Sequence, residues 1–171
     1  PVLVDVDPKT FNIDIPSIEK AIGPKTKAII PVHLFGQAAD MEEILALAKK
    51  NNLYVVEDNA QSIGADYTFS DGSKKKTGTL GHIGTTSFFP SKNLGAYGDG
   101  GAIFTNDDEL AHTIRGMVNH GMYIRYQHDV VGVNSRLDSV QAAILDIKLN
   151  LLDFYNESRK AAALKYNQRL A

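Results

Sequence analysis

The apolar residues of this chain fall into short β-branched runs separated by segments of helical period. The runs that predict strands are residues 2–6, 27–32, 53–57, 83–89 and 102–105. Between the second and third runs, a helix is predicted from Asp40, with an apolar face made of Met41, Ile44, Leu45 and Ala48. Asp40 and Glu43 have the spacing of a capping box. This α/β order, with short connections, predicts a mostly parallel sheet with helices on both faces.

A turn signal and a short connection refine this picture in the middle of the chain. Asp71 and Gly72 favour a tight hairpin turn, and the lysines at 74–76 are expected to be solvated. About a dozen residues separate the last two strand-like runs, which is too few for a helical crossover. The strand at 102–105 is therefore expected to be antiparallel. A short helix is also predicted at residues 15–22, with Ser17 near its start.

The C-terminal third is predicted to be mainly helical. Residues 107–118 predict a helix with Asn106 as its cap, and residues 119–133 predict a loop. Ser135, with Asp138 three residues later, predicts the start of a long helix that runs past residue 160. Apolar side chains recur in it at spacings of three and four, at Leu137, Val140, Ile144, Ile147, Leu151 and Phe154.

The ends of the chain favour a piece of a longer polypeptide. It starts without methionine in the strand-like run PVLVDVD and stops in the helix-like run LKYNQRLA. We expect residues 137–171 to be a long helix that links residues 1–136 to a further domain. Within that helix, Asn156-Glu157-Ser158 matches a glycosylation acceptor. We set this motif aside because it lies in a predicted helix and the chain shows no secretory signal.

Composition excludes several classes of protein. The 171 residues are 43% hydrophobic and carry a net charge of −2, which argues against disorder and against a nucleic-acid partner. No apolar run approaches the roughly 18 residues that span a bilayer, so no membrane partner is expected. The absence of cysteine excludes disulfides and fits a cytoplasmic protein. The five histidines lack the spacing of metal ligands, so no metal site is expected.

Chemistry is expected at the carboxyl ends of the predicted strands, because open α/β sheets bind ligands there. The segments that fall at these ends are residues 33–37, 58–62 and 87–93. Asp58 ends an apolar strand, where a carboxylate needs a partner. It is either a functional group or a structural one.

The segment TSFFPSKNLGAYGDGG, at 86–101, raises a similar choice. Lys92 is either a solvated turn residue or an amine held in a pocket for Schiff-base chemistry. Ser87 either binds an anion or caps backbone groups. The glycines at 95, 98, 100 and 101 lack the spacing of dinucleotide or Walker loops, so they predict a turn that shapes the backbone around Lys92.

Three segments together carry a resemblance to a known family: EDNAQSIGA at 57–65, TSFFPSKNLGAYGDGGAIFTND at 86–107 and VVGVNSRLDSVQAAIL at 130–145. On these motifs the whole chain resembles the DegT/DnrJ/EryC1/StrS sugar aminotransferases. These are pyridoxal-phosphate enzymes of the aspartate aminotransferase fold, type I. The resemblance implies that residues 1–136 are the central part of the cofactor-binding large domain, and that residues 137–171 lead to an absent C-terminal small domain.

The resemblance also implies roles for matching residues. Lys92 would bind pyridoxal phosphate covalently, and Asp58 would pair with the protonated pyridine nitrogen. Ala60 would pack against the ring, and Gln61 would hydrogen-bond near its phenolic oxygen. Ser87 would contact the phosphate. After an amine displaces it, the lysine would be a free base placed to move a proton.

Members of this family share their active sites across a homodimer, so Asn134 would reach the phosphate bound by the neighbouring subunit. Their usual amino donor is glutamate, and the acceptor is a keto sugar linked to a nucleotide such as dTDP or UDP. Related dehydratases carry histidine at the position of Lys92, so deoxygenation is disfavoured. The segments at 84–95 and 128–143 look most like members that aminate C3 in polysaccharide biosynthesis.

Some family features lie outside this sequence. The phosphate-binding Gly-Thr or Gly-Ser segment and the aromatic that stacks on the ring would precede Pro1. We therefore expect the chain to be inactive by itself. The alternative is a non-catalytic regulatory or structural relative, or an inactive piece, of the same fold.

Overall fold

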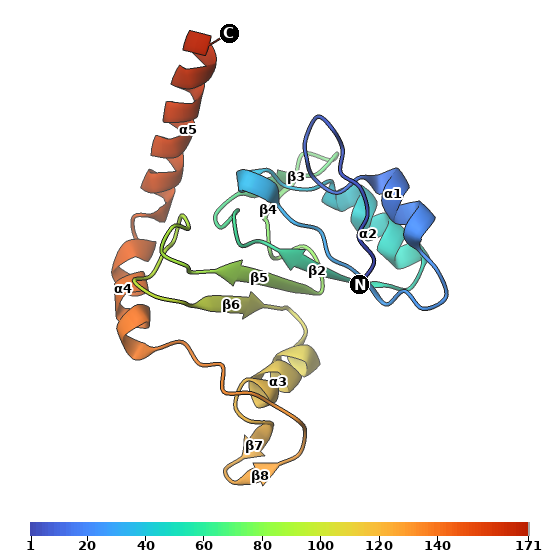
Figure 1. Ribbon diagram of the computed structural model, residues 1–171, viewed down its shortest axis with the longest axis vertical. Coiled ribbons are helices and arrows are strands. Elements are labelled where there is room, and N and C mark those ends of the chain that lie inside the picture. Colours follow the sequence, from blue (N-terminus) through green and yellow to red (C-terminus); the bar gives the residue numbers. More distant parts are fainter. Residues whose placement is uncertain (171) are drawn as a thin grey trace.

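A four-stranded mixed sheet forms the centre of the protein (Figure 1). The computed structural model describes residues 1–170. The strands lie in the order β1 (Ala28–Ile29), β2 (Tyr54–Asp58), β5 (Ile83–Ser87) and β6 (Gly101–Phe104). The first three strands are parallel, and β6 is antiparallel to β5. The predicted α/β class and the antiparallel last strand are therefore confirmed.

Alternation along β2 divides the sheet into two faces. Val55 and Glu57 are fully buried on the face covered by α2 (Met41–Lys50). Tyr54 lies on the opposite face and is 57% exposed. The main core joins α1 (Ile15–Ala21), α2 and the sheet through buried apolar side chains, among them Ile18, Ile29, Ile44, Leu47 and Val55.

The N-terminal strands are shorter than predicted. Residues 2–6 form no strand, and only Val6 pairs, in an isolated bridge with Ile13. β1 ends at Ile29, and Val32 regains a bridge to Asp58. Pro31, between them, has no N–H to donate to a ladder, which explains the interruption.

The hairpin predicted at Asp71-Gly72 is confirmed. Strands β3 (Asp66–Thr68) and β4 (Lys74–Lys76) pair antiparallel on either side of it. The lysines of β4 are exposed, and Lys76 forms a 2.8 Å surface ion pair with Asp66. The capping box at α2 is wrong, because the Asp40 carboxylate accepts a hydrogen bond from the Tyr67 hydroxyl at 3.0 Å instead of capping helix N–H groups.

Two elements differ from prediction between residues 106 and 133. Helix α3 (Asp108–Met117) is capped by Asp107, whose carboxylate accepts hydrogen bonds from Glu109 N and Leu110 N, and not by Asn106. The region predicted as a loop contains a small hairpin of β7 (Met122–Ile124) and β8 (Gln127–His128). Figure 1 shows this hairpin beyond α3, away from the main sheet.

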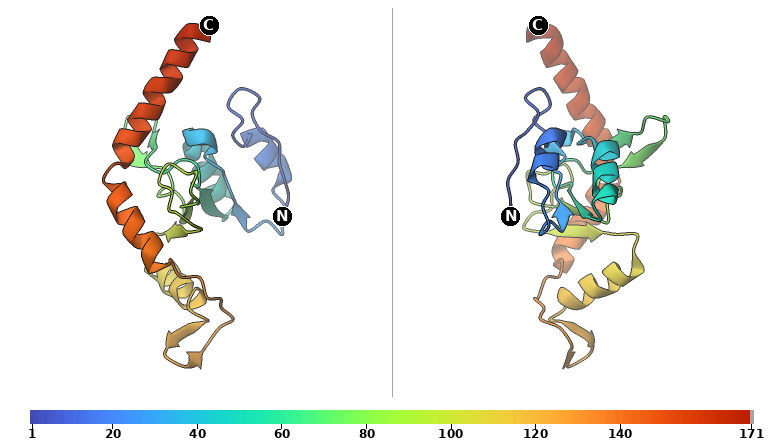
Figure 2. Two further views of the ribbon diagram at one scale, coloured as in Figure 1. Left: turned by 60° about the vertical axis from the view of Figure 1, so that its left-hand side comes forward. Right: turned by 90° about the vertical axis from the view of Figure 1, so that its right-hand side faces the viewer.

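The long C-terminal helix is in fact two helices. Helix α4 (Ser139–Leu149) is capped by Asp138 through Val140 N at 2.7 Å, so the predicted cap at Ser135 is wrong. The helix is interrupted at residues 150–151, and the chain continues as α5 (Leu152–Leu170). Figure 2 shows the two helices joined at an angle, on the opposite side of the molecule from α1. That residues 137–171 link two domains stays a prediction.

Candidate active site

The carboxyl ends of β2 and β5 bring two of the predicted site residues together. Asp58 is the last residue of β2, and Ser87 is the last residue of β5. The parallel register pairs Asp58 with Thr85, so Asp58, Thr85 and Ser87 lie on one face of the sheet. Lys92 follows on the loop that leaves the same end of β5. Both Asp58 and Lys92 are partly buried.

A tight turn follows Asp58. Its Oδ1 accepts a hydrogen bond from Ala60 N at 3.0 Å, and Asn59 N donates to Thr85 O at 2.8 Å. β2 therefore ends at Asp58, and the extended geometry from which Ala60 would face the same side does not persist. Ala60 is placed by the turn instead. We call residues 59–65 the Asp58 loop.

Gln61 links this loop to the short helix that follows β1. Its Oε1 accepts a hydrogen bond from Phe35 N at 3.0 Å. Phe35 lies in the short helix η1 (Leu34–Gly36) with a φ of 55° and is 83% exposed. A left-handed φ is costly for a bulky residue, so this contact helps to hold a strained turn beside the site.

Residues 88–100 form a compact loop around Lys92, here called the Lys92 loop. Lys92 N donates to Phe89 O at 2.9 Å, and Ala96 N donates to Phe88 O at 2.7 Å. A Cβ at Gly95 would lie 2.3 Å from Pro90 O, so the turn requires glycine there. The Ser87 Oγ accepts a hydrogen bond from Phe89 N at 3.2 Å. The loop thus holds the lysine backbone through its own hydrogen bonds.

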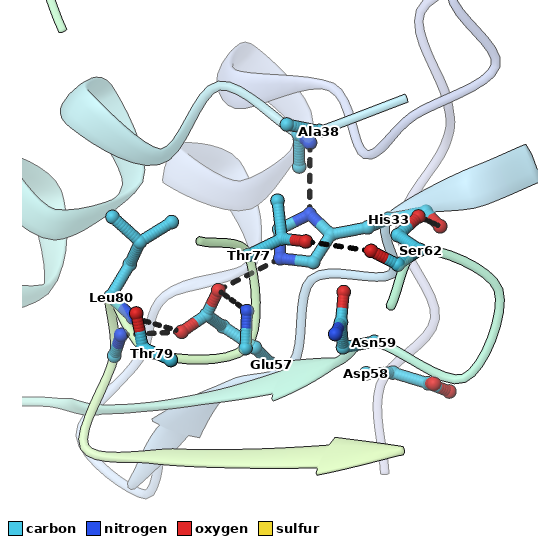
Figure 3. Close-up of polar contacts among 12 residues, drawn as sticks. His33, Ala38, Glu57, Asp58, Asn59, Ser62, Thr77, Thr79 and Leu80 are labelled. Carbon is cyan, nitrogen blue, oxygen red and sulfur yellow. Dashed lines mark hydrogen bonds and ion pairs between the residues drawn. The ribbon is translucent and has the colours of Figure 1, made fainter. Parts of the chain in front are cut away.

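Sequence reasoning missed a buried pair directly beside Asp58. His33 Nε2 lies 2.8 Å from Glu57 Oε2, and neither side chain is exposed. His33 Nδ1 accepts a hydrogen bond from Ala39 N at 3.0 Å, so Nε2 carries the proton and donates to Glu57. Figure 3 shows the Asp58 side chain directed away from this pair.

The Glu57 carboxylate also accepts three backbone hydrogen bonds. The donors are Gly78 N, at 2.8 Å, and Leu80 N and Gly81 N, both at 2.6 Å. Burial by itself raises the pKa of Glu57, but the bonds from His33 and these amides outweigh it and hold the pKa below its usual 4.5. The signal in the sequence was an acidic residue at a core-facing position of an apolar strand.

Asn134 lies apart from the other predicted residues. It is exposed, and its Oδ1 accepts a hydrogen bond from Arg136 Nε at 2.9 Å. An isolated bridge to Asn119 places it just after the end of α3. The structure therefore does not bring Asn134 to the carboxyl ends of β2 and β5 in the same chain.

Residues 1–170 carry neither a metal-binding cluster nor a membrane-spanning helix. No cluster of three or more His, Cys, Asp or Glu side chains has the arrangement of a metal site among these residues. Across the same span, no helix has both the length and the apolar character needed to cross a membrane.

The groups at the carboxyl ends of β2 and β5 fit pyridoxal phosphate chemically. A lysine amine can bind its aldehyde, a carboxylate can pair with its ring nitrogen, and a hydroxyl can donate to its phosphate. Lys92, Asp58 and Ser87 supply these groups from two neighbouring strand ends. Gln61 adds an amide on the loop between them.

Residues 1–171 match the sequence pattern of the DegT/DnrJ/EryC1/StrS aminotransferase family. The chain belongs to this family. It is 56% identical to a pleiotropic regulatory protein of Geobacillus stearothermophilus, over 99% of this chain and 44% of that protein. It is 53% identical to UDP-2-acetamido-2-deoxy-3-oxo-D-glucuronate aminotransferase of Pseudomonas aeruginosa, over 99% of this chain and 46% of that enzyme.

Solved structures of the family share the fold. The structure of DesV from S. venezuelae, in complex with a ketimine intermediate, superposes with a TM-score of 0.93 at 44% identity. The match covers all of this chain and 45% of that one. The chain thus spans less than half the length of the relatives it matches.

Proposed function

We propose that the intact protein is a pyridoxal-phosphate-dependent aminotransferase that moves an amino group from glutamate to a keto sugar linked to a nucleotide. One observation carries this proposal: Asp58 and Ser87 lie on the same face of the sheet, and the Lys92 loop begins directly after Ser87. Membership of an aminotransferase family supports the reaction class. The names of two relatives support the substrate class: one is an aminotransferase for a UDP-linked 3-oxo sugar, and the other is a transaminase for a dTDP-linked amino sugar.

In this proposal each residue holds one part of the cofactor. Lys92 would bind it covalently through Nζ, and Asp58 would keep the ring nitrogen protonated. Ser87 would donate its hydroxyl hydrogen to the phosphate, while Gln61 and Ala60 would orient the ring. When bound, the cofactor supplies the electron sink that stabilises negative charge at the reacting carbon.

Lys92 would have a second role once the substrate amine has replaced it as the group bound to the cofactor. Its free Nζ would accept a proton from the substrate carbon and hold it for return, as a general base and acid. The backbone of the Lys92 loop is fixed by hydrogen bonds at Phe88 and Phe89. The amine would therefore move between the cofactor and the substrate carbon by rotation of the lysine side chain alone.

The partners in this proposal include a second copy of the chain. Asn134 is exposed and lies away from Lys92, which suits a residue that reaches the phosphate bound by a neighbouring subunit. We propose a cytoplasmic homodimer with shared active sites. For the acceptor we propose C3 of the sugar, in amino-sugar biosynthesis for surface polysaccharide, because one relative acts on a 3-oxo sugar.

The decisive experiment compares the intact protein with its Lys92→Ala variant. Wild-type protein incubated with pyridoxal phosphate should gain an absorbance band that the variant lacks. It should also transfer nitrogen from ¹⁵N-glutamate to one member of a panel of keto-sugar nucleotides, read by mass spectrometry. Absence of product with every member would contradict the substrate class, and absence of the band would contradict the cofactor assignment.

One relative supports a second candidate function. The chain is 56% identical to a protein named as a pleiotropic regulator, which favours a regulatory member of the family as the alternative. The same assay separates the two functions. A protein that binds pyridoxal phosphate at Lys92 yet transfers no nitrogen, while deletion of its gene changes expression of other genes, would support the regulator.

A further inference from the structure

The side chain of Asn156 contacts both loops of the candidate site. It projects from the second turn of α5. Its Oδ1 lies 2.6 Å from Asn93 Nδ2, on the residue next to Lys92. Its Nδ2 lies 3.1 Å from Ile63 O, in the Asp58 loop. A single amide therefore joins the Lys92 loop to the Asp58 loop.

The orientation of this amide follows from its partners. Ile63 O is a carbonyl oxygen and can only accept, so the Asn156 NH₂ must face it. The Asn156 oxygen then faces Asn93, whose side chain must donate. Both polar atoms of the Asn156 amide are engaged. The motif that starts at Asn156 and matches a glycosylation acceptor therefore has a structural use inside the fold.

Gly64 makes room for this contact. It has a φ of +87°, and a Cβ there would lie 2.8 Å from Asn156 Nδ2. The glycine thus allows the chain to turn after Ile63 and also allows the amide to approach its carbonyl. Leu152, one turn before Asn156, is buried beside Ile63 and fixes the start of α5 over the loop.

Other contacts hold the Lys92 loop on the helices, and an apolar cluster also joins this loop to Ile63 of the Asp58 loop. Lys148 of α4 donates to Gly95 O, and Gln141 Oε1 accepts from Tyr97 N at 2.8 Å. Leu145 packs in the same apolar cluster as Phe88. Asn156 adds hydrogen bonds to this apolar packing and, among residues 1–170, is the side chain that bonds to both loops.

We propose that Asn156 is a positioning residue, which holds Lys92 in register with Asp58 and Gln61 by linking the two loops. This inference rests on the proposed role of Lys92 in binding pyridoxal phosphate. It predicts that loss of the link lowers the reactivity of Lys92 toward the cofactor by more than it lowers the stability of the fold.

The test measures covalent labelling of Lys92 in the intact protein. Pyridoxal phosphate condenses with the lysine amine with loss of water, and borohydride then reduces the C=N bond to a stable amine. Peptide mass spectrometry compares the labelling rate at Lys92 with that at Lys165, an exposed lysine of α5. Asn156→Leu should lower the rate at Lys92 by roughly threefold to tenfold, the effect of one or two lost hydrogen bonds, and leave Lys165 unchanged.

Two further variants separate the bonds of the link. Asn93→Leu cuts the same connection from the other side, so it should have the same effect, and the double variant should be no worse than either single variant. Asn156→Asp keeps an acceptor for Asn93 but replaces the donor to Ile63 O with a second acceptor, so the link to the Asp58 loop is lost and slow labelling of Lys92 is again expected. Asn93→Leu serves as the test if Asn156→Leu does not fold.

Glu42→Leu is the matched control. Glu42 also ties a helix to a loop through two hydrogen bonds, to Ser70 Oγ at 2.6 Å and Ser70 N at 2.9 Å, but on the β3–β4 side of the fold. It should lower resistance to urea without slowing Lys92 labelling. Equal Lys92 labelling in Asn156→Leu and wild type, or independent effects in the double variant, would overturn the positioning role. A wild-type protein that labels Lys92 no faster than Lys165 would overturn the cofactor role as well.

Discussion

His33 donates its Nε2 proton to Glu57 across 2.8 Å, and Glu57 is the residue immediately before Asp58. Adjacent residues of a strand point to opposite faces. The core face of β2 is therefore held by a fully bonded carboxylate, while the next side chain faces the candidate site. This pair joins the segment after β1, the end of β2 and the turn before β5 through buried hydrogen bonds.

Removal of the Glu57 carboxylate should be strongly destabilising. Glu57→Ala leaves His33 and three backbone N–H groups without their buried acceptor. We expect the free energy of unfolding to fall by about 3 to 5 kcal/mol, measured by urea denaturation. Glu157→Ala is the control, since its side chain is 75% exposed and the expected change is below about 0.5 kcal/mol. A loss at Glu57 no larger than at Glu157 would contradict this account.

The free energy of unfolding should fall in acid because the Glu57 carboxylate becomes protonated. The folded-state pKa of Glu57 is lowered, so its contribution is present above its usual pKa of 4.5 and is lost as pH falls through the folded-state value. Hydrogen bonds from Thr10 to Asp7, and from Ser73 to Asp71, lower those pKa values in the same direction. Urea denaturation from pH 7 to pH 3 should therefore show wild type and Glu57→Gln converging below pH 4.5. Parallel curves would exclude Glu57 as the source.

The turn at Gly95 should not tolerate a side chain. In Gly95→Ala the new Cβ would overlap the backbone oxygen of Pro90, which no side-chain rotation relieves. We expect a loss of about 1 to 3 kcal/mol in the free energy of unfolding and slower pyridoxal-phosphate labelling of Lys92. Gly23→Ala is the matched control, because nothing lies within 4 Å of its Cβ position. Identical behaviour of the two variants would show that the loop has more room than the structure indicates.

Asp58→Asn tests the charge of Asp58 separately from its turn. Asparagine keeps an oxygen that accepts from Ala60 N, so the fold should be preserved. It cannot hold a proton on the pyridine nitrogen, and a lost charge-assisted hydrogen bond lowers the transamination rate by about 10- to 100-fold. Steady-state kinetics of the intact protein and a melting curve measure the two effects. Full activity in Asp58→Asn would contradict the proposed pairing.

Much of the sheet could be predicted from local pattern. The β-branched runs located β2, β5 and β6, and the short connection between the last two indicated their antiparallel pairing. Family motifs indicated Asp58 and Lys92. These features depend on residues close together in the sequence, so a linear reading can find them.

The missed features depend on partners distant in the sequence. Asp40 had a capping pattern, but Tyr67 draws its carboxylate away from the helix. The roles of Glu57 and Asn156 require His33 and Ile63, from other parts of the chain. The observed caps are acidic residues, one position after Asn106 and three positions after Ser135, and spacing alone did not show that they would be preferred.

The ladder between β5 and β6 has a mechanical consequence for Lys92. Ser87 pairs directly with Gly101, so the Lys92 loop is a closed ring whose base is clamped by the sheet. The two ends of this ring cannot separate without breaking ladder hydrogen bonds. The backbone of Lys92 can therefore move only as far as the loop tilts about its two paired ends. The length of the lysine stem, and not movement of the sheet, sets how far the amine can reach.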